Sequence, residues 1–254
     1  MHIPTMAGTI DRRILVNYRV DPGYLEKLLP DPFRPKRIHG MGIAGICLIR
    51  LKQLRPRSLP ALLGFSSENA AHRVAVEWEE DGEYREGVYI PRRDTASQFN
   101  TFVGGKLFPG VHHHAQFEIR ESDDSFHIQL VSDDGETRVA VDAHTASHLP
   151  EDSIFASLEE ASAFFEHGSL GYSDARKAGN LDSLELHCRN WKVEPLQVTK
   201  AESSFFDDQQ RFPSGSAELD CALLMRAIQH EWYAREPVRA TPRLEEATSV
   251  NAAR

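Results

Sequence analysis

The sequence predicts a mainly β protein, a β-rich α+β fold in which a curved or closed antiparallel sheet has a few peripheral helices. Segments of alternating apolar and polar residues dominate the chain. Turn-forming sequences such as Asp81-Gly82 separate these segments, and only three segments show helical spacing. A closed sheet would have no exposed edges, but the periodicity alone fits a barrel or a sandwich equally well.

Local signals place the elements along the chain. A short helix is expected between Asp21, which would cap it, and Pro30, which would stop it. Ser157, with Glu160 three residues later, forms a capping box for a second amphipathic helix. In chain order we expect strands over residues 14–20, 41–54, 72–79 and 86–90, a helix over 95–107, strands over 112–119, 126–131 and 138–144, a helix over 157–166, and strands over 184–189, 191–200 and 217–228.

The chain of 254 residues is long enough for one sizeable core, and we find no internal repeat or linker. We therefore expect a single domain over residues 1–233, followed by a polar, aperiodic and disordered tail over residues 234–254. The segment 41–54 is apolar on both faces at first, as expected of a strand inside a closed sheet.

Composition excludes several classes of function. A net charge of -9 without a basic cluster argues against a nucleic-acid partner. No apolar run is long enough to cross a bilayer, and the N-terminus lacks the blocks of a signal peptide, so we expect a cytoplasmic protein without a membrane partner. Cys47, Cys188 and Cys221 are far apart in apolar segments, which favours small buried residues over a disulfide framework or a zinc site.

A run of three histidines is the sharpest local feature. It lies in the segment Pro109-Gly-Val-His-His-His114, where an extended strand would place His112 and His114 on one face and His113 on the other. Imidazoles at this position could transfer protons near neutral pH, or one face could simply be solvated while the other packs. We expect no metal site, because the other histidines are scattered without ligand spacing.

A second polar group precedes an apolar strand at Glu68-Asn-Ala-Ala-His72-Arg73. If Glu68 and Arg73 face one cavity, they could pair and steer a carboxylate substrate, because arginine offers a forked donor. The alternative is a surface ion pair, which is the commoner outcome. Arg19 also interrupts a strand and is open to both interpretations.

Four short motifs connect the chain to a known family. The segments 168–172, 190–196, 203–207 and 216–220 (Gly-Ser-Leu-Gly-Tyr, Asn-Trp-Lys-Val-Glu-Pro-Leu, Ser-Ser-Phe-Phe-Asp and Ser-Ala-Glu-Leu-Asp) resemble those of domain of unknown function 2071, in the acetoacetate decarboxylase-like superfamily. The resemblance extends from about Ile14 to Trp232. It implies a curved, cone-like antiparallel β-barrel with a central cavity and helices packed outside, and it permits a homo-oligomer.

The resemblance also shows where the chemistry differs. Acetoacetate decarboxylase has two adjacent lysines, one of which forms a Schiff base with the substrate. The matching stretch here has histidines, His112 to His114, and an imidazole cannot form the iminium. Lys106 is close in sequence, but we expect it to be a solvated residue of the preceding helix. The acidic partner of the decarboxylase pocket matches Glu68. Schiff-base decarboxylation is therefore not expected.

Two hypotheses remain. In the first, the protein is an enzyme, a lyase or isomerase without a cofactor, that acts on a small oxo or hydroxy acid or another carbonyl compound. One of the three histidines would transfer protons together with Glu68, and Arg73, His72 and Arg19 would bind the substrate. In the second, the same cavity belongs to a non-catalytic small-molecule binding protein.

Overall fold

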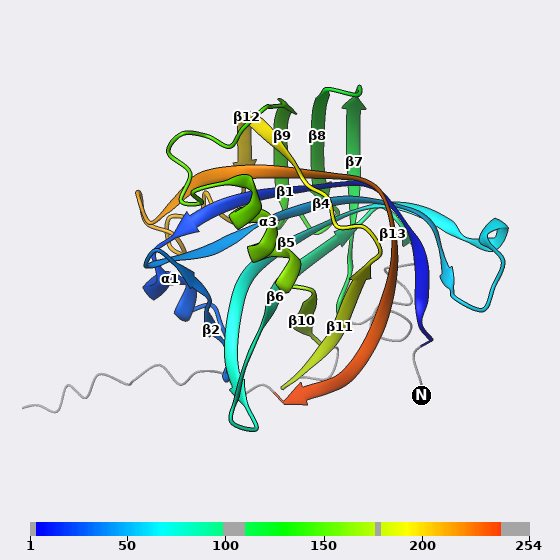
Figure 1. Ribbon diagram of the computed structural model, residues 1–254, viewed down its shortest axis with the longest axis horizontal. Coiled ribbons are helices and arrows are strands. Elements are labelled where there is room, and N and C mark those ends of the chain that lie inside the picture. The colour runs from blue at the N-terminus through cyan, green and yellow to red at the C-terminus, as the bar shows by residue number, and fades with distance from the viewer. Residues whose placement is uncertain (1–3, 99–109, 176–178, 240–254) are drawn as a thin grey trace, which may run out of the picture.

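The computed structural model describes residues 4–98, 110–175 and 179–239, and it is mainly β (Figure 1). Its helices are short: α1 (Pro22–Glu26), the 3₁₀ turn η1 (Ala61–Leu63) and α3 (Leu158–His167). The strands are β1 (Met6–Val20), β2 (Arg34–Pro35), β3 (Arg37–Ile38), β4 (Met41–Pro56), β5 (Phe65–Glu80), β6 (Glu83–Thr95), β7 (His113–Glu121), β8 (Ser125–Ser132), β9 (Arg138–Thr145), β10 (Leu170–Asp174), β11 (Asn180–Cys188), β12 (Glu194–Ser203) and β13 (Ala217–Arg239).

The strands form one sheet that closes on itself twice. The strand order is β11-β10-β6-β7-β8-β9-β12-β13-β1-β4-β5-β2, with further pairings of β11 to β13 and of β6 to β5. One closed circuit, called here the small ring, comprises β1, β4, β5, β6, β10, β11 and β13. The other, the large ring, replaces β10 and β11 with β7, β8, β9 and β12. The expected curved and closed sheet is confirmed, and Figure 1 shows β7 to β9 rising on one side and β10 and β11 lying on the other.

Two strands take part in both closures by changing partners along their length. β6 pairs with β10 at residues 88–90 and with β7 at Asp94 and Thr95. β13 pairs with β12 at residues 222–224 and with β11 at residues 230–239. Both of these pairings of β6 are parallel, so the sheet is mixed and not purely antiparallel as the sequence analysis expected.

The shared strands bury both of their faces, which explains why residues 41–49 are apolar on both faces. Ile14 and Ile46 face a first core with side chains of β8 and β9, whereas Leu15 and Cys47 face a second core with Phe165 of α3. Because side chains alternate along a strand, the even-numbered apolar residues from Ile14 to Val20 and from Ala44 to Leu48 point to the first core, and the odd-numbered Leu15, Ile43, Cys47 and Ile49 point to the second. The second core contains the cavity described below.

The helix caps match the sequence signals. The Asp21 carboxylate accepts a hydrogen bond from the Gly23 amide at 2.8 Å at the start of α1. Ser157 Oγ accepts from the Glu160 amide at 3.2 Å, and the Glu160 carboxylate accepts from the Ala156 amide at 2.6 Å. These bonds satisfy amides that a helix end leaves without partners, so both helix starts are specified locally.

Two differences from the expectation concern the C-terminal tail and the segment 95–107. β13 continues to Arg239, so residues 234–239 belong to a strand and not to a disordered tail. This strand is extended because β11 pairs with it as far as Arg239. No local pattern in the sequence predicts this pairing. β6 continues to Thr95, so the helix expected over residues 95–107 does not begin at Thr95, and residues 99–107 lie outside the described part.

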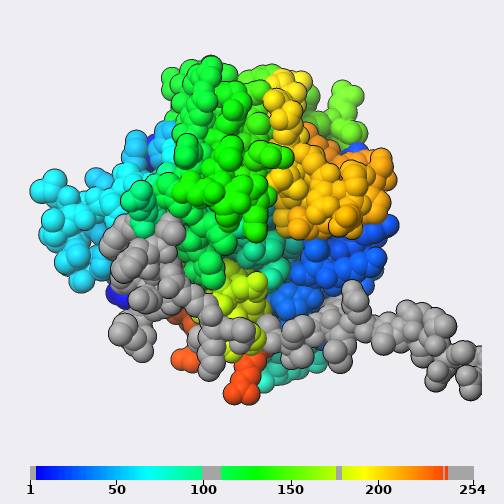
Figure 2. All heavy atoms as spheres, turned by 180° about the vertical axis from the view of Figure 1, so that it is seen from behind, coloured from blue at the N-terminus to red at the C-terminus, as the bar shows by residue number. Residues whose placement is uncertain are grey.

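The connection between β4 and β5 projects from the body of the molecule, as Figure 2 shows from behind. It includes η1, whose Leu62 is 93% exposed. Within the described ranges, no helix combines the length and the hydropathy needed to cross a membrane.

Candidate functional site: a cavity with three arginines

A cavity of about 150 Å³ lies between the small ring and α3. Most of its wall is apolar, and Ile49 of β4, Ile90 of β6, Phe165 of α3 and Leu184 of β11 contribute to it. Strands from both halves of the chain and one helix therefore build it together. A concave, mainly apolar cavity with few polar groups is the usual form of a small-molecule site.

Three arginines line this cavity: Arg13 of β1, Arg73 of β5 and Arg93 of β6. Arg13 and Arg73 have odd numbers and so occupy the faces of their strands that look toward the second core. Arg93 reaches the same space through an irregularity in β6, where the pairing with β5 shifts between His72 and Val74. Such bulges redirect side chains and occur often beside functional sites.

The partners of these guanidinium groups are neutral. Arg13 Nε donates to Cys47 Sγ at 3.4 Å, and Arg93 Nε donates to Ser173 Oγ at 2.9 Å. Arg73 donates to the Asn17 side-chain oxygen, and its ring contact is Phe165, whose centroid lies 4.8 Å from the guanidinium carbon. Among the described residues, no carboxylate forms an ion pair with any of the three.

Burial makes these charges costly. Arg73 is only 4% exposed, and its Nε has no hydrogen-bond partner within the described part of the chain. Burial lowers the pKa of Arg73 to about 10 and that of Arg93 to about 10. A desolvated cation without an opposite charge is destabilising, so an anion in the cavity would offset part of this cost.

His112 and Asp94 add groups that can exchange protons at the same cavity. His112 Nδ1 lies 3.2 Å from the Gly110 carbonyl oxygen, which can only accept, so Nδ1 carries the proton and Nε2 is the basic nitrogen of the neutral ring. Asp94 is fully buried, with one oxygen 2.8 Å from Arg92 Nη2 and the other without a partner among the described groups. Burial raises the pKa of Asp94.

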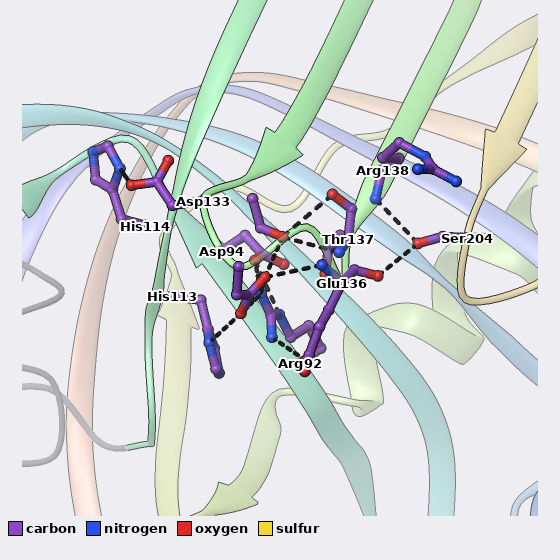
Figure 3. Close-up of polar contacts among 11 residues, drawn as sticks. Arg92, Asp94, His113, His114, Asp133, Glu136, Thr137, Arg138 and Ser204 are labelled. Atoms are coloured by element: carbon purple, nitrogen blue, oxygen red, sulfur yellow. Dashed lines mark hydrogen bonds and ion pairs between the residues drawn. The ribbon is translucent and has the colours of Figure 1, made fainter.

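His113 and His114 have partners outside the cavity (Figure 3). His113 Nδ1 lies 3.0 Å from the Asp134 carboxylate, and His114 Nδ1 lies 2.8 Å from the Asp133 carboxylate. Both acids lie in the turn between β8 and β9. Asp134 also accepts from Arg92, which joins His113 to an ion-pair network that includes Asp94 and Glu136.

Glu68 and His72 point to the other face of β5. The Glu68 carboxylate pairs with Arg12 at 2.7 Å and with Arg50, and Glu121 completes this network. His72 is 1% exposed, with Nε2 3.0 Å from Ser203 Oγ and its ring stacked on Phe205. Glu68 and Arg73 do not share a cavity and do not pair, because residues separated by an odd number lie on opposite faces of a strand.

Arg19 lies at the surface, away from the cavity. Its Nη2 is 3.0 Å from Glu218 and 3.4 Å from Asp152. Of the residues singled out by the sequence, the structure therefore places Arg73 and His112 at the cavity and the other five elsewhere. The described residues contain no group of three histidine, cysteine or acidic side chains suited to a metal ion.

Four charged cavity residues were missed: Arg13, Lys36, Arg93 and Asp94. Lys36 follows the short strand β2 and pairs with Glu86 of β6. The alternation of β1 is the signal that could have found Arg13, because its odd number places it with Leu15 on the face opposite Ile14. Arg93 and Asp94 follow the irregularity in β6, and Pro91 is the only local hint of it.

Comparison of the sequence with protein families gives one match over most of its length. Domain of unknown function 2071, described as an uncharacterised conserved protein, matches residues 8–239. The chain belongs to this family. The resemblance inferred from four short motifs is thereby confirmed. No protein with a curated description matches the sequence significantly.

Solved structures place the family member in a known fold. Acetoacetate decarboxylase from Legionella pneumophila subsp. pneumophila str. Philadelphia 1 aligns with a TM-score of 0.57 and 13% identity, over 93% of this chain and 88% of that one. An acetoacetate decarboxylase-like enzyme from Sphingomonas wittichii RW1 aligns at 0.57 and 10%, over 95% of each chain. The enduracididine biosynthesis enzyme MppR, complexed with pyruvate, aligns at 0.59 and 10%, over 94% and 91%. At these identities the similarity establishes the fold.

Proposed function

We propose that this protein binds a small carboxylate-bearing oxo or hydroxy acid in the cavity between the small ring and α3. One observation supports this most strongly: Arg13, Arg73 and Arg93 line a single space of about 150 Å³, and none of them forms an ion pair with a described carboxylate. The whole chain has a net charge of -9, so this cluster of positive charge is local. The complex of MppR with pyruvate shows that a protein of this fold accepts such an acid.

The arginines would bind the carboxylate of the ligand, and the apolar wall would contact its carbon chain. A guanidinium group offers two parallel N–H donors to a carboxylate, which fixes its position and its plane. The apolar wall, with Ile49, Ile90 and Leu184, suits a short carbon chain and excludes water. Low polarity around the pair strengthens the attraction between them.

A binding measurement with matched variants tests this proposal. Titration calorimetry with pyruvate should show binding to the wild-type protein and none with the uncharged analogue pyruvamide. Arg93→Gln should weaken binding by about tenfold or more, because a charge-assisted hydrogen bond contributes roughly 1.5–3 kcal/mol. Arg120→Gln is the control, since Arg120 is 73% exposed and pairs with Glu118 outside the cavity. Equal loss in both variants, or equal binding of pyruvamide, would contradict the proposal.

His112 supports a second candidate function, proton transfer to or from the bound acid. Its basic Nε2 belongs to a ring that lines the same cavity as the arginines. An oxo acid held by its carboxylate has acidic hydrogens on the carbon next to its ketone, and an imidazole has the basicity to remove one near neutral pH. This chemistry needs no Schiff base and is shared by lyases and isomerases.

Hydrogen exchange measures this step directly. In deuterated water, proton NMR should show loss of the pyruvate methyl signal faster with the protein than without it. His112→Gln should lower the protein-dependent rate by about 100-fold, the usual contribution of one general base. His144→Gln is the control, because His144 is exposed on β9 and contacts Gln197. A loss found in His113→Gln but not in His112→Gln would assign the proton transfer to another ring.

A further inference from the structure

Cys47 places a thiol in the wall of the cavity that the three arginines line. It lies on β4, and its odd number directs the side chain to the second core, where it lines the cavity. Its Sγ accepts a hydrogen bond from Arg13 Nε at 3.4 Å. Sulfur is a weak acceptor, so this contact leaves the guanidinium poorly satisfied. Cys47 is 7% exposed and lies in the wall of the cavity.

The other two cavity arginines also lie near this sulfur. Burial lowers the pKa of both Arg73 and Arg93, and a negative charge on Cys47 acts in the opposite direction on each. Arg73 provides an independent sign of a ligand, because it is 4% exposed, lines the cavity and has an unpartnered Nε among the described residues. A carboxylate held by Arg73 would lie in the same cavity as the thiol.

The other cysteines differ in their surroundings. Cys221 is 2% exposed, and burial, followed by the negative charge of Asp220, raises the pKa of its thiol. Cys188 lies on β11, outside the wall of this cavity, and burial raises its pKa too, opposed by Arg13 and reinforced by Glu166. Of the thiols in this chain, Cys47 is the one that shares a cavity with all three guanidinium groups.

We propose that Cys47 is a nucleophile that adds reversibly to the carbonyl carbon of an α-oxo acid held by the arginines, and this inference rests on the proposed function. The sulfur forms a bond to the carbonyl carbon, the electron pair of the C=O double bond moves to the oxygen, and the proton of the thiol is transferred to that oxygen. The product is a tetrahedral thiohemiketal that contains every atom of the thiol and the acid. No oxidant, reductant or further reactant takes part.

The arginines would have two roles in this addition. One guanidinium holds the carboxylate, and another faces the carbonyl oxygen, where negative charge develops as the sulfur approaches. Covalent capture would then use a thiol, since the segment that matches the Schiff-base lysines has histidines, His112 to His114, and the cavity lysine Lys36 is paired with Glu86.

Alkylation rates test the reactivity without knowledge of the natural ligand. The full chain is treated in parallel with iodoacetate and with iodoacetamide, and each cysteine is followed by peptide mass spectrometry. Solvated thiols react faster with the uncharged reagent. Cys47 should react at least tenfold faster with iodoacetate, because the arginines attract its carboxylate, and pyruvate should protect it. Cys188 provides the internal reference and should keep the ordinary preference. A Cys47 that is inert, or that prefers iodoacetamide, overturns the inference.

The adduct itself is detected with pyruvate labelled with ¹³C at the ketone carbon. The wild-type protein and Cys188→Ser should both show a new signal of a tetrahedral carbon, and Cys47→Ser should lack it while it still binds pyruvate by calorimetry. If wild-type protein binds pyruvate but gives no adduct, the nucleophile is refuted and the proposed function stands. If no variant binds pyruvate or reacts preferentially with iodoacetate, both the proposed function and the inference fail.

Discussion

Two buried histidines should make this protein unfold in mild acid. His230 is 2% exposed, and neither ring nitrogen has a hydrogen-bond partner among the described groups. Burial, followed by the nearby Arg13 charge, lowers its pKa to about 4. Burial, followed by the charges of Arg211 and Arg92, lowers the pKa of His72 to about 3. Both rings are therefore neutral in the folded protein at a pH where an unfolded chain would protonate them.

The sign and size follow from proton linkage. The unfolded state, with a histidine pKa of about 6.5, binds more protons than the folded state between about pH 6.5 and about pH 4, so the free energy of unfolding falls as pH falls through this range. For each ring the loss between neutral pH and about pH 5 is about 2 kcal/mol. The two together remove about 4 kcal/mol, a large part of the stability of a typical domain.

Urea unfolding at several pH values measures this effect. His230→Leu should have a free energy of unfolding that depends less on pH, by about 2 kcal/mol between neutral pH and about pH 5. His144→Leu is the control, because His144 is exposed and its replacement removes no burial penalty. If the wild-type protein is equally stable across this range, or if His230→Leu loses as much stability in acid as the wild type, the histidines are not responsible.

Three further predictions concern single positions. A Cβ added at Gly45 would lie 2.3 Å from the Val16 carbonyl oxygen, so Gly45→Ala should lower the free energy of unfolding by about 3 kcal/mol. Gly168→Ala is the control and should change it little, because the nearest contact of its added Cβ is 3.6 Å. Equal effects of the two substitutions in urea unfolding would refute this reasoning. Asp220→Ala should cost about 2 kcal/mol by the same assay, because the carboxylate accepts from the Ile154 amide at 2.7 Å; a neutral result would mean that water replaces it. Borohydride with pyruvate should leave no adduct on Lys36, the cavity lysine paired with Glu86, and a trapped adduct found by mass spectrometry would restore imine chemistry.

Much of the fold follows from local patterns in the sequence. The alternation of Ile14 to Val20, the Asp81-Gly82 turn and the caps at Asp21 and Ser157 each specify an element that the structure contains. Asp81 and Gly82 both have positive φ, at 55° and 78°, which a two-residue hairpin requires. The partners of each strand depend on long-range packing, so the two parallel pairings of β6 and the extension of β13 were not predictable from these signals.

The candidate site was predicted less completely, and the reason differs from residue to residue. Glu68 and Arg73 are five positions apart, so the alternation of a strand already places them on opposite faces, and only Arg73 lines the cavity. His112 precedes β7, which begins at His113, so strand alternation did not apply to it. Arg93 lies beyond an irregular pairing, where a period of two no longer tells which face a side chain occupies.

The pairing of the first long strand with the last has a consequence for how the chain folds. β1 and β13 are hydrogen-bonded along nearly their whole lengths, and the side-chain contact between Thr9 and Gln229 spans 220 positions. Both rings contain this pair, so neither can close before residues near the C-terminus have been synthesised. Contacts of such separation slow folding because a long loop must be closed first. Until then β1 and β4 expose two apolar faces, and the nascent chain is most open to aggregation at this stage.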